Sequence, residues 1–162
     1  MQFNAGGKLV NPKLIVLHYT GGISAQGTIS WFANPLSKVS AHYVVARDGI
    51  VHVCVPTDRI AYTNGTSQWR GLTAINKHAI SIEMVNLGLL SDDNYSRSGW
   101  KVEDSDLVTS ADGRKWHKYT QPQIEAVAKL CAELKQKYPT IDEIVGHSDI
   151  APKRKIDPGD GY

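Results

Sequence analysis

The sequence predicts a single-domain α/β fold in which helices flank a mixed central β-sheet. Short apolar runs typical of buried strands alternate along the chain with segments of helical periodicity. The length of 162 residues is typical of one domain. Of these residues, 41% are hydrophobic and 21% are charged, as in a folded globular protein. We therefore expect one domain over residues 1–162, with its core between about 13 and 159.

The first predicted strand carries a histidine to its end. The branched apolar run of residues 13–19 is stopped by Thr20-Gly21-Gly22, so a buried strand is expected to place His18 at the rim of a sheet. Residues 24–34 are long enough for a helix that ends at an Asn-Pro pair. The side chains expected to face inward from this helix are Ile23, Ile29, and Phe32 or Trp31.

A hairpin and a second strand follow. Residues 42–47 and 50–55 flank Asp48-Gly49, a pair that supplies the positive φ angles of a two-residue turn, and they predict a β-hairpin. In residues 79–85, small or polar residues alternate with apolar ones, which predicts a strand. One face of it would carry Ile80, Ile82 and Met84, and the other Ser81 and Glu83.

The remaining chain predicts a long loop, a helix and a last strand. Residues 87–118 are polar and lack periodicity, so we expect a long loop, a feature that is usually functional or mobile. Thr120 is an N-cap residue with Pro122 in the first turn and Gln123 three positions on, which predicts a helix to Tyr138. Its expected inward positions are Ile124, Val127, Ala128, Cys131, Leu134 and Tyr138. Residues 143–146 predict a short strand leading into His147.

Composition and charge exclude several classes of protein. The net charge of +2 is too small and too evenly spread to indicate a nucleic-acid partner. No run approaches the ~18 apolar residues of a membrane span, and residues 1–7 lack the basic and apolar parts of a signal peptide. We expect a monomer made in the cytoplasm, without membrane insertion. Cys54 and Cys131 lie in apolar stretches and are predicted to be buried and reduced.

The Pro-punctuated segment 146–159 predicts a metal centre. It holds His147, Lys155 and Asp157, whose side chains are costly to bury unless they are paired or bind a metal. His18 and His147 each follow an apolar strand, and neighbouring strand ends share one rim of a sheet. With Asp157 they would give Zn²⁺ three ligands and leave a fourth position for water, as in catalytic zinc sites. Two histidines argue against magnesium or calcium.

Two further residues fit amide hydrolysis at such a site. Zinc lowers the pKa of a bound water to about 7 and polarises a carbonyl. Glu83, on a predicted strand and without a basic neighbour in sequence, is the candidate to move the proton from water to the leaving amine. Lys155 lies two residues before Asp157 and is the candidate to stabilise the oxyanion.

These residues resemble the zinc-dependent N-acetylmuramoyl-L-alanine amidases of the type-2 amidase group. The resemblance extends from about residue 14 to 159. The motifs that carry it are Gly146-His147-Ser148-Asp149-Ile150-Ala151-Pro152, Arg154-Lys155, Asp157-Pro158-Gly159, Ile15-Val16-Leu17-His18-Tyr19, Ser40-Ala41-His42-Tyr43, Arg47-Asp48-Gly49 and Ser81-Ile82-Glu83. It implies cleavage between N-acetylmuramic acid and L-alanine in peptidoglycan or muropeptides. It also implies that His18, His147 and Asp157 bind one zinc ion and that Glu83 and Lys155 are catalytic.

Three functions fit this resemblance. The first is a lytic enzyme of the phage endolysin kind that acts on the cell wall after release, and the second is a cytoplasmic recycling amidase that acts on soluble anhydromuropeptides. The third is a non-catalytic peptidoglycan-binding module. Recognition-only members of the group tend to lose the third ligand, so the presence of Asp157 favours an enzyme.

Two positions depart from the family pattern. Some phage members carry a catalytic tyrosine where Ala41 stands, so Glu83 would have to carry the proton transfer. Many members carry a histidine where Thr63 stands, and we expect Thr63 to lie at the substrate.

Other residues are candidates for the cleft or for packing. His42 could line the cleft. Trp69, Trp100 and Trp116 fall in irregular segments, where indole rings could stack on sugar or peptide or could cover a small core. Asp149 could orient a ligand histidine by accepting its second N–H, or it could cap the following turn.

Overall fold

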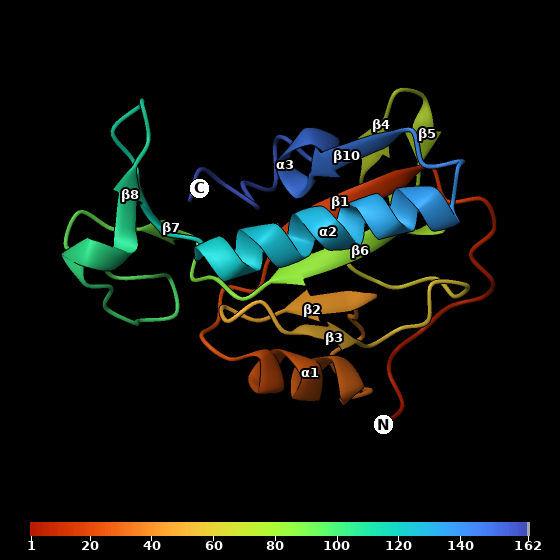
Figure 1. The fold of residues 1–162 in the computed structure, drawn as a ribbon, viewed down its shortest axis with the longest axis horizontal. Coiled ribbons are helices and arrows are strands. Elements are labelled where there is room, and N and C mark those ends of the chain that lie inside the picture. Colours follow the sequence, from red (N-terminus) through yellow and green to blue (C-terminus); the bar gives the residue numbers. More distant parts are fainter. Residues whose placement is uncertain (162) are drawn as a thin grey trace.

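The central sheet confirms the predicted mixed α/β architecture. The computed structural model describes residues 1–161, and its main sheet has the strand order β10-β1-β6-β2-β3 (Figure 1). The bounds of these strands are Glu143–Gly146 (β10), Leu14–Tyr19 (β1), Ala79–Met84 (β6), Tyr43–Val45 (β2) and Val51–Val53 (β3). The first four of them are parallel to one another, and β3 is antiparallel to β2. The carboxyl ends of four strands therefore meet at one edge of the sheet.

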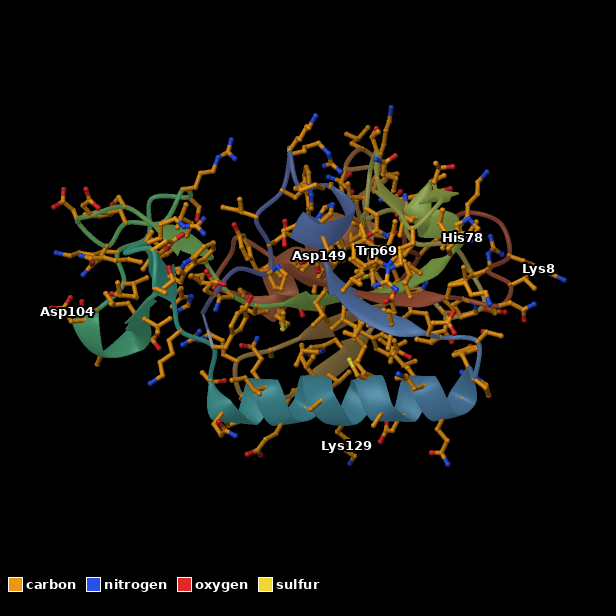
Figure 2. The ribbon with its side chains drawn as sticks, turned by 90° about the horizontal axis from the view of Figure 1, so that it is seen from above. Lys8, Trp69, His78, Asp104, Lys129 and Asp149 are labelled. Carbon is orange, nitrogen blue, oxygen red and sulfur yellow. The ribbon has the colours of Figure 1, made fainter. Side chains whose placement is uncertain are left out.

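Helices cover both faces of this sheet. The helices are Ala25–Ala33 (α1), Gln121–Lys137 (α2) and His147–Ile150 (α3). Adjacent strand residues point to opposite faces, and Val45 packs in a core with Val127 of α2 while Val44 packs with Phe32 of α1. Figure 2 shows α3, marked by Asp149, on the side of the sheet opposite α2. None of the helices within residues 1–161 is long and apolar enough to cross a membrane.

The two long helices begin where the sequence predicts. Ser24 caps α1 by accepting the Gly27 N–H at 3.2 Å, and Thr120 caps α2 by accepting the Gln123 N–H at 3.3 Å. The predicted inward faces are partly wrong, because Ile23, Ile124 and Ala128 are exposed. Of the alternatives Phe32 and Trp31, the structure buries Phe32 and leaves Trp31 exposed. The positions of α2 that are buried instead are Gln123, Val127, Leu130, Cys131 and Leu134. Cys54 and Cys131 are buried and free, as predicted.

The β2–β3 connection is longer than the predicted two-residue turn. Ala46 and Ile50 close it through a backbone hydrogen bond of 2.9 Å, and of the Asp48-Gly49 pair only Gly49 has a positive φ, of 87°. Asp48 instead accepts the Ile50 N–H through its side chain at 3.0 Å. A Cβ on Gly49 would lie 2.8 Å from the Pro122 carbonyl oxygen, so the turn packs closely against the first turn of α2.

Residues 87–118 form a folded lobe, so the prediction of a loop without elements is wrong. The lobe contains a three-stranded sheet in the order β7-β9-β8 that projects beyond the end of the central sheet (Figure 1). Its elements are Leu89–Leu90 (β7), Asp104–Asp106 (η2), Leu107–Thr109 (β8) and Lys115–His117 (β9). A small cluster of Leu87, Leu90, Val102 and Leu107 forms its core. Two more short strands, Gln68–Trp69 (β4) and Leu72–Thr73 (β5), and a 3₁₀ turn, Ile75–Lys77 (η1), precede β6.

Side chains join the lobe to the body of the protein. Arg47, which follows β2, donates two hydrogen bonds of 2.8 Å to the Asp106 carboxylate of the lobe. The buried His117 accepts the Leu87 N–H on Nδ1 at 3.0 Å, so its proton lies on Nε2, which donates to Asp106 at 3.1 Å. At the start of the lobe, a Cβ on Gly88 would lie 2.3 Å from the ring of Tyr19 at the end of β1. The contacts of Arg47 and Tyr19 fix the position of the lobe relative to the sheet edge, while those of His117 lie within the lobe.

Candidate metal centre

Neighbouring strands place His18 and Glu83 side by side. In the parallel pairing of β1 and β6, His18 is in register with Glu83. Both residues lie on the face opposite α2, because the alternate residues Ile15, Ile80 and Ile82 pack under that helix. The two side chains therefore stand together near the carboxyl ends of their strands.

His147 and Asp157 reach the same place from the C-terminal segment. Gly146, the last residue of β10, is in register with Leu17, and His147 begins α3 directly after it. The following loop returns to this point, since the Ser148 N–H donates to the carbonyl of Asp157 at 2.9 Å. A third ligand candidate is thereby brought beside the two histidines.

The three predicted ligands form one buried cluster. The Nδ1 atoms of His18 and His147 lie 3.0 Å apart, and Oδ2 of Asp157 lies 3.1 Å from the first and 2.9 Å from the second. A tetrahedral ion with ligand distances of about 2.0–2.1 Å holds its ligand atoms roughly 3.3 Å apart. All three residues are buried, and their ligand atoms fit one metal ion.

The tautomer of His147 suits a metal ligand. Its Nε2–H donates to the carbonyl of Asn64 at 3.1 Å, which leaves the Nδ1 lone pair facing His18 and Asp157. The same carbonyl accepts a hydrogen bond of 2.8 Å from Nη2 of Arg154. The sequence gives no signal for this partner, because the orienting group is a backbone carbonyl.

Asp149 does not orient a ligand. Its Oδ2 accepts the Gly146 N–H at 2.7 Å and so caps the start of α3. Of the two roles considered for Asp149, the structure therefore places it in the capping role.

Burial and hydrogen bonding keep the cluster in protonation states that suit a bound cation. Burial lowers the pKa of His18, although the hydrogen bond with Asp157 opposes this shift. Burial alone would raise the pKa of Asp157, but its contacts with the ring nitrogens of His147 and His18 outweigh this effect and hold that pKa well below its usual range. A neutral imidazole on His18 and an ionised carboxylate on Asp157 are the forms in which these side chains bind metals.

Glu83 and Lys155 line the cleft beside the cluster. Glu83 is only 9% exposed, and its Oε2 has no hydrogen-bond partner within residues 1–161. Burial, followed by the nearby charge of Asp157, raises the pKa of Glu83 to about 8. Lys155 is half-buried, and its positive charge opposes that shift. Both side chains face an open cleft of about 1050 Å³ whose floor includes the cluster.

The structure brings only part of the predicted substrate-binding set to this cleft. Thr63 and Trp100 line it. Oγ1 of Thr63 is buried and has no partner among the described residues.

The prediction that His42 could line the cleft is not supported by its position. His42 is fully buried, and its Nδ1 accepts the Ser81 N–H at 2.9 Å, so its proton lies on Nε2 and is donated to the Arg59 carbonyl at 2.9 Å. Both nitrogens are therefore used within the protein, and burial lowers the pKa of His42 to about 4.

Trp69 and Trp116 also take the packing role. Trp69, which is labelled in Figure 2, packs against the core cluster that includes Ile150 of α3. It donates its indole N–H to Glu143 at 2.5 Å. Trp116 is 1% exposed, and a Cβ on Gly159 would lie 2.2 Å from its ring. Neither residue lines the cleft.

Comparison with known proteins assigns the chain to a family. The family model described as N-acetylmuramoyl-L-alanine amidase matches residues 8–160, which include the whole cluster. The chain belongs to this amidase family.

Individual relatives agree with the family assignment. The 1,6-anhydro-N-acetylmuramyl-L-alanine amidase AmpD of Escherichia coli (strain K12) is 30% identical over 145 residues, which are 89% of this chain and 64% of AmpD. The crystal structure of a selenomethionine derivative of AmpD superposes with a TM-score of 0.74 and 25% identity, covering 99% of this chain and 86% of that one. AmiD from E. coli, solved in complex with anhydro-N-acetylmuramic acid-L-Ala-D-γ-Glu-L-Lys, gives a TM-score of 0.71 and 28% identity over 93% of this chain and 53% of AmiD. This amidase chain thus spans just under two thirds of the length of the E. coli AmpD sequence.

Proposed function

We propose that this chain is a zinc-dependent amidase that hydrolyses the bond between N-acetylmuramic acid and L-alanine in peptidoglycan. The observation that carries the proposal is the buried cluster of His18, His147 and Asp157 at the floor of an open cleft, next to a carboxyl group with an unpartnered oxygen. A complete set of three ligands separates this chain from a module that only binds peptidoglycan. Membership of the amidase family supports the choice of bond.

The donor set favours zinc. Two imidazole nitrogens and one carboxylate oxygen are typical of catalytic zinc sites, whereas magnesium and calcium prefer oxygen ligands. When bound, zinc lowers the pKa of a coordinated water to about 7 and polarises the carbonyl of the scissile amide. His18 and His147 would hold it through Nδ1, and Asp157 through Oδ2.

Glu83 is proposed to move the proton. Its raised pKa, of about 8, reflects burial without a positive partner in contact, and a cation in the adjacent cluster would bring that pKa down towards neutrality. A carboxyl group with such a pKa can accept a proton from water and deliver it to the nitrogen of L-alanine as the C–N bond breaks. The register of β1 and β6 keeps this group beside His18.

Lys155 and two cleft residues complete the proposed site. Lys155 lines the cleft without an ion pair among the described residues, so its ammonium group is available to stabilise the oxyanion that forms on the amide carbonyl. Thr63 and Trp100 are proposed to contact the substrate, since both line the same cleft.

A murein assay tests this function. Purified murein should release new L-alanine amino termini when the protein is added, a chelator should abolish the release, and zinc should restore it. Turnover that survives complete metal removal would contradict the metalloenzyme proposal. Absence of L-alanine termini from the products of the zinc-loaded protein would contradict the proposed bond.

A second candidate function is hydrolysis of soluble anhydromuropeptides. The observation that favours it is the similarity to AmpD, whose name specifies a 1,6-anhydro-N-acetylmuramyl substrate. We propose the lytic function first, in which the protein is made in the cytoplasm and reaches the wall after release. Rates on intact sacculi and on soluble fragments, measured side by side, separate the two functions, because a recycling enzyme would act on the fragments alone.

A further inference from the structure

The lobe extends the cleft beyond the metal centre. Trp100 of the lobe and Ile23 of the body line the main cleft, and both also line a second hollow of about 530 Å³. Leu87, at the start of the lobe, lines both spaces as well. The second hollow therefore continues the cleft along the lobe, on a path that begins at the metal cluster.

Exposed apolar side chains gather on this path. Trp100 is 52% exposed and Ile23 48% exposed, and Trp31 of α1, which lines the main cleft, is 54% exposed. Large apolar side chains are usually withdrawn from water, so their grouping around a cleft indicates a ligand with apolar faces. The faces of sugar rings are of this kind, and indole rings combine a flat apolar surface with a polar edge.

The turn that carries Trp100 is fixed in place. The Trp100 N–H donates to Oγ of Ser96 at 3.0 Å, and the Ser96 N–H donates to the carbonyl of Trp100 at 2.8 Å. Oγ of Ser98 donates to the carbonyl of Gly21 in the body at 3.0 Å. Since the turn is tied both to itself and to the sheet edge, little ordering of the Trp100 backbone is needed on binding.

The charges on the two sides of the cleft differ. The ionisable side chains around the second hollow, apart from His117, are Arg47, Lys101, Glu103 and Asp106. They balance in sign, and Arg47 already pairs with Asp106 at 2.8 Å.

A third hollow of about 670 Å³, which shares Thr63 and Lys155 with the main cleft, lies on the other side. Its lining includes Lys38, Arg154 and Lys155 and has no acidic side chain among the described residues. Arg97 of the lobe lines the main cleft beside Trp100. The second hollow, whose charges balance, thus suits an uncharged ligand, whereas the third hollow suits carboxylates.

We infer that the lobe side of the cleft binds the glycan chain beyond the cleaved N-acetylmuramic acid, with Trp100 stacked on a sugar ring. This inference rests on the proposed amidase function and adds the direction in which the substrate lies. Peptide-bearing glycan carries no charge, because the carboxyl group of each muramic acid is used in the amide. The stem peptide, which has free carboxylates, would then extend toward Lys38 and Arg154.

Kinetics on two substrates test the inference. Trp100→Ala should lower kcat/KM about tenfold on linear glycan chains that carry stem peptides, and by a clearly smaller factor on a single N-acetylmuramoyl peptide. Trp100→Phe should retain most of the activity on chains. Tyr95→Ala is the matched control, because Tyr95 is a similarly exposed aromatic residue of the lobe that lines neither space.

The outcomes separate this inference from the proposed function. Equal losses on both substrates, or no loss on either, would overturn the glycan subsite while leaving the amidase intact. Failure of the wild-type protein on the single-sugar peptide would instead count against the proposed function. A binding measurement on the wild-type protein covers the case in which Trp100→Ala does not fold. Chitotetraose, an uncharged oligosaccharide, should shift the indole N–H resonance of Trp100, and an unchanged resonance at saturating sugar would overturn the subsite.

Discussion

At the scale of single residues, Glu83 is buried, and one oxygen of its carboxyl group has no hydrogen-bond partner among the described residues. A buried polar atom without a partner destabilises the folded state, so its presence beside the metal cluster is explained by chemistry rather than by packing. Glu83→Gln should lower kcat by about 10²–10⁴-fold, the range that general acid–base catalysis contributes. The melting temperature should stay the same or rise.

The control for this variant is Glu125→Gln, since Glu125 lies on the exposed side of α2. Its kcat should equal that of the wild-type protein. An unchanged kcat in Glu83→Gln, measured on murein with zinc bound, would remove Glu83 from the proton-transfer role.

The burial of His42 is expected to make the folded protein less stable in acid. Burial lowers the pKa of His42 to about 4, so between this value and about 6.5 the unfolded chain binds a proton that the folded protein excludes. The stabilisation that comes from keeping His42 neutral is fully present above pH 6.5. As the pH falls toward 4, the loss of this stabilisation lowers the free energy of unfolding by on the order of 3 kcal/mol. Urea unfolding of His42→Gln, compared with wild type at pH 7 and pH 4.5, should show a smaller decrease for the variant. If the free energy of unfolding decreased equally in both proteins, His42 would not be the source of the acid sensitivity.

The cluster of candidate ligands was predictable from residue type, but the roles of other polar residues were not. His18 and His147 each lie at the end of a predicted strand, and Asp157 lies in the Pro-rich loop that follows the second one, so the sequence could bring these three metal-binding residue types together. His42 is also a histidine near a strand, yet its two nitrogens bond to backbone groups that the sequence does not place beside it. The carbonyl of Asn64 has no sequence signature at all.

At the scale of elements, one glutamine joins α2 to the sheet. Gln123 is fully buried, and its Nε2 donates to the carbonyls of Val45 and Val85 at 3.0 and 3.1 Å. Gln123→Ala would leave two buried carbonyls without this donor, so it should lower the free energy of unfolding by about 1–3 kcal/mol. Gln121→Ala is the matched control, because Gln121 bonds only to Glu125 on the exposed face of the same helix. Urea unfolding measures the free energy of unfolding of both variants. A similarly small decrease in the two variants would contradict the prediction.

The loop after α3 should tune the metal site through Arg154. Its Nη2 donates to the carbonyls of Asn64 and Thr66 at 2.8 Å each, and thereby fixes the group that orients His147. Arg154→Ala should weaken zinc binding about 10-fold, at the lower end of effects from partners of ligand residues. Lys153→Ala, an exposed neighbour without such contacts, should leave the affinity unchanged. Competition with a chelating dye measures both affinities, and equal values for the two variants would exclude this role.

The elements with the clearest pattern in the sequence are the long ones. β1, β6 and α2 contain six residues or more, which is enough for a period of two or of 3.6 to be visible. The strands of the lobe have two or three residues, too few for alternation to be distinguished from chance. The lobe is held instead by contacts between distant residues such as Arg47 and Asp106. The local sequence pattern therefore predicts a loop over residues 87–118, where the structure has a small sheet.

At the scale of the whole molecule, the metal centre joins parts of the chain that are distant in sequence. His18 comes from β1, while His147 begins α3 and Asp157 lies in the loop that follows α3. The unfolded chain cannot hold these groups together, so an ion that binds all three binds the folded state almost exclusively. We therefore expect metal binding and folding to be coupled across the full sheet.

Zinc should stabilise the folded protein in proportion to its excess over the dissociation constant. At free zinc about 100 times that constant, the free energy of unfolding should rise by about 2.7 kcal/mol. Asp157→Asn removes the charged ligand and should lose most of this gain, while Asp160→Asn, an exposed neighbour outside the cluster, should keep it. Urea unfolding of each protein in buffered zinc and in chelator measures the difference. An equal gain in Asp157→Asn would mean that zinc stabilises the protein from another site.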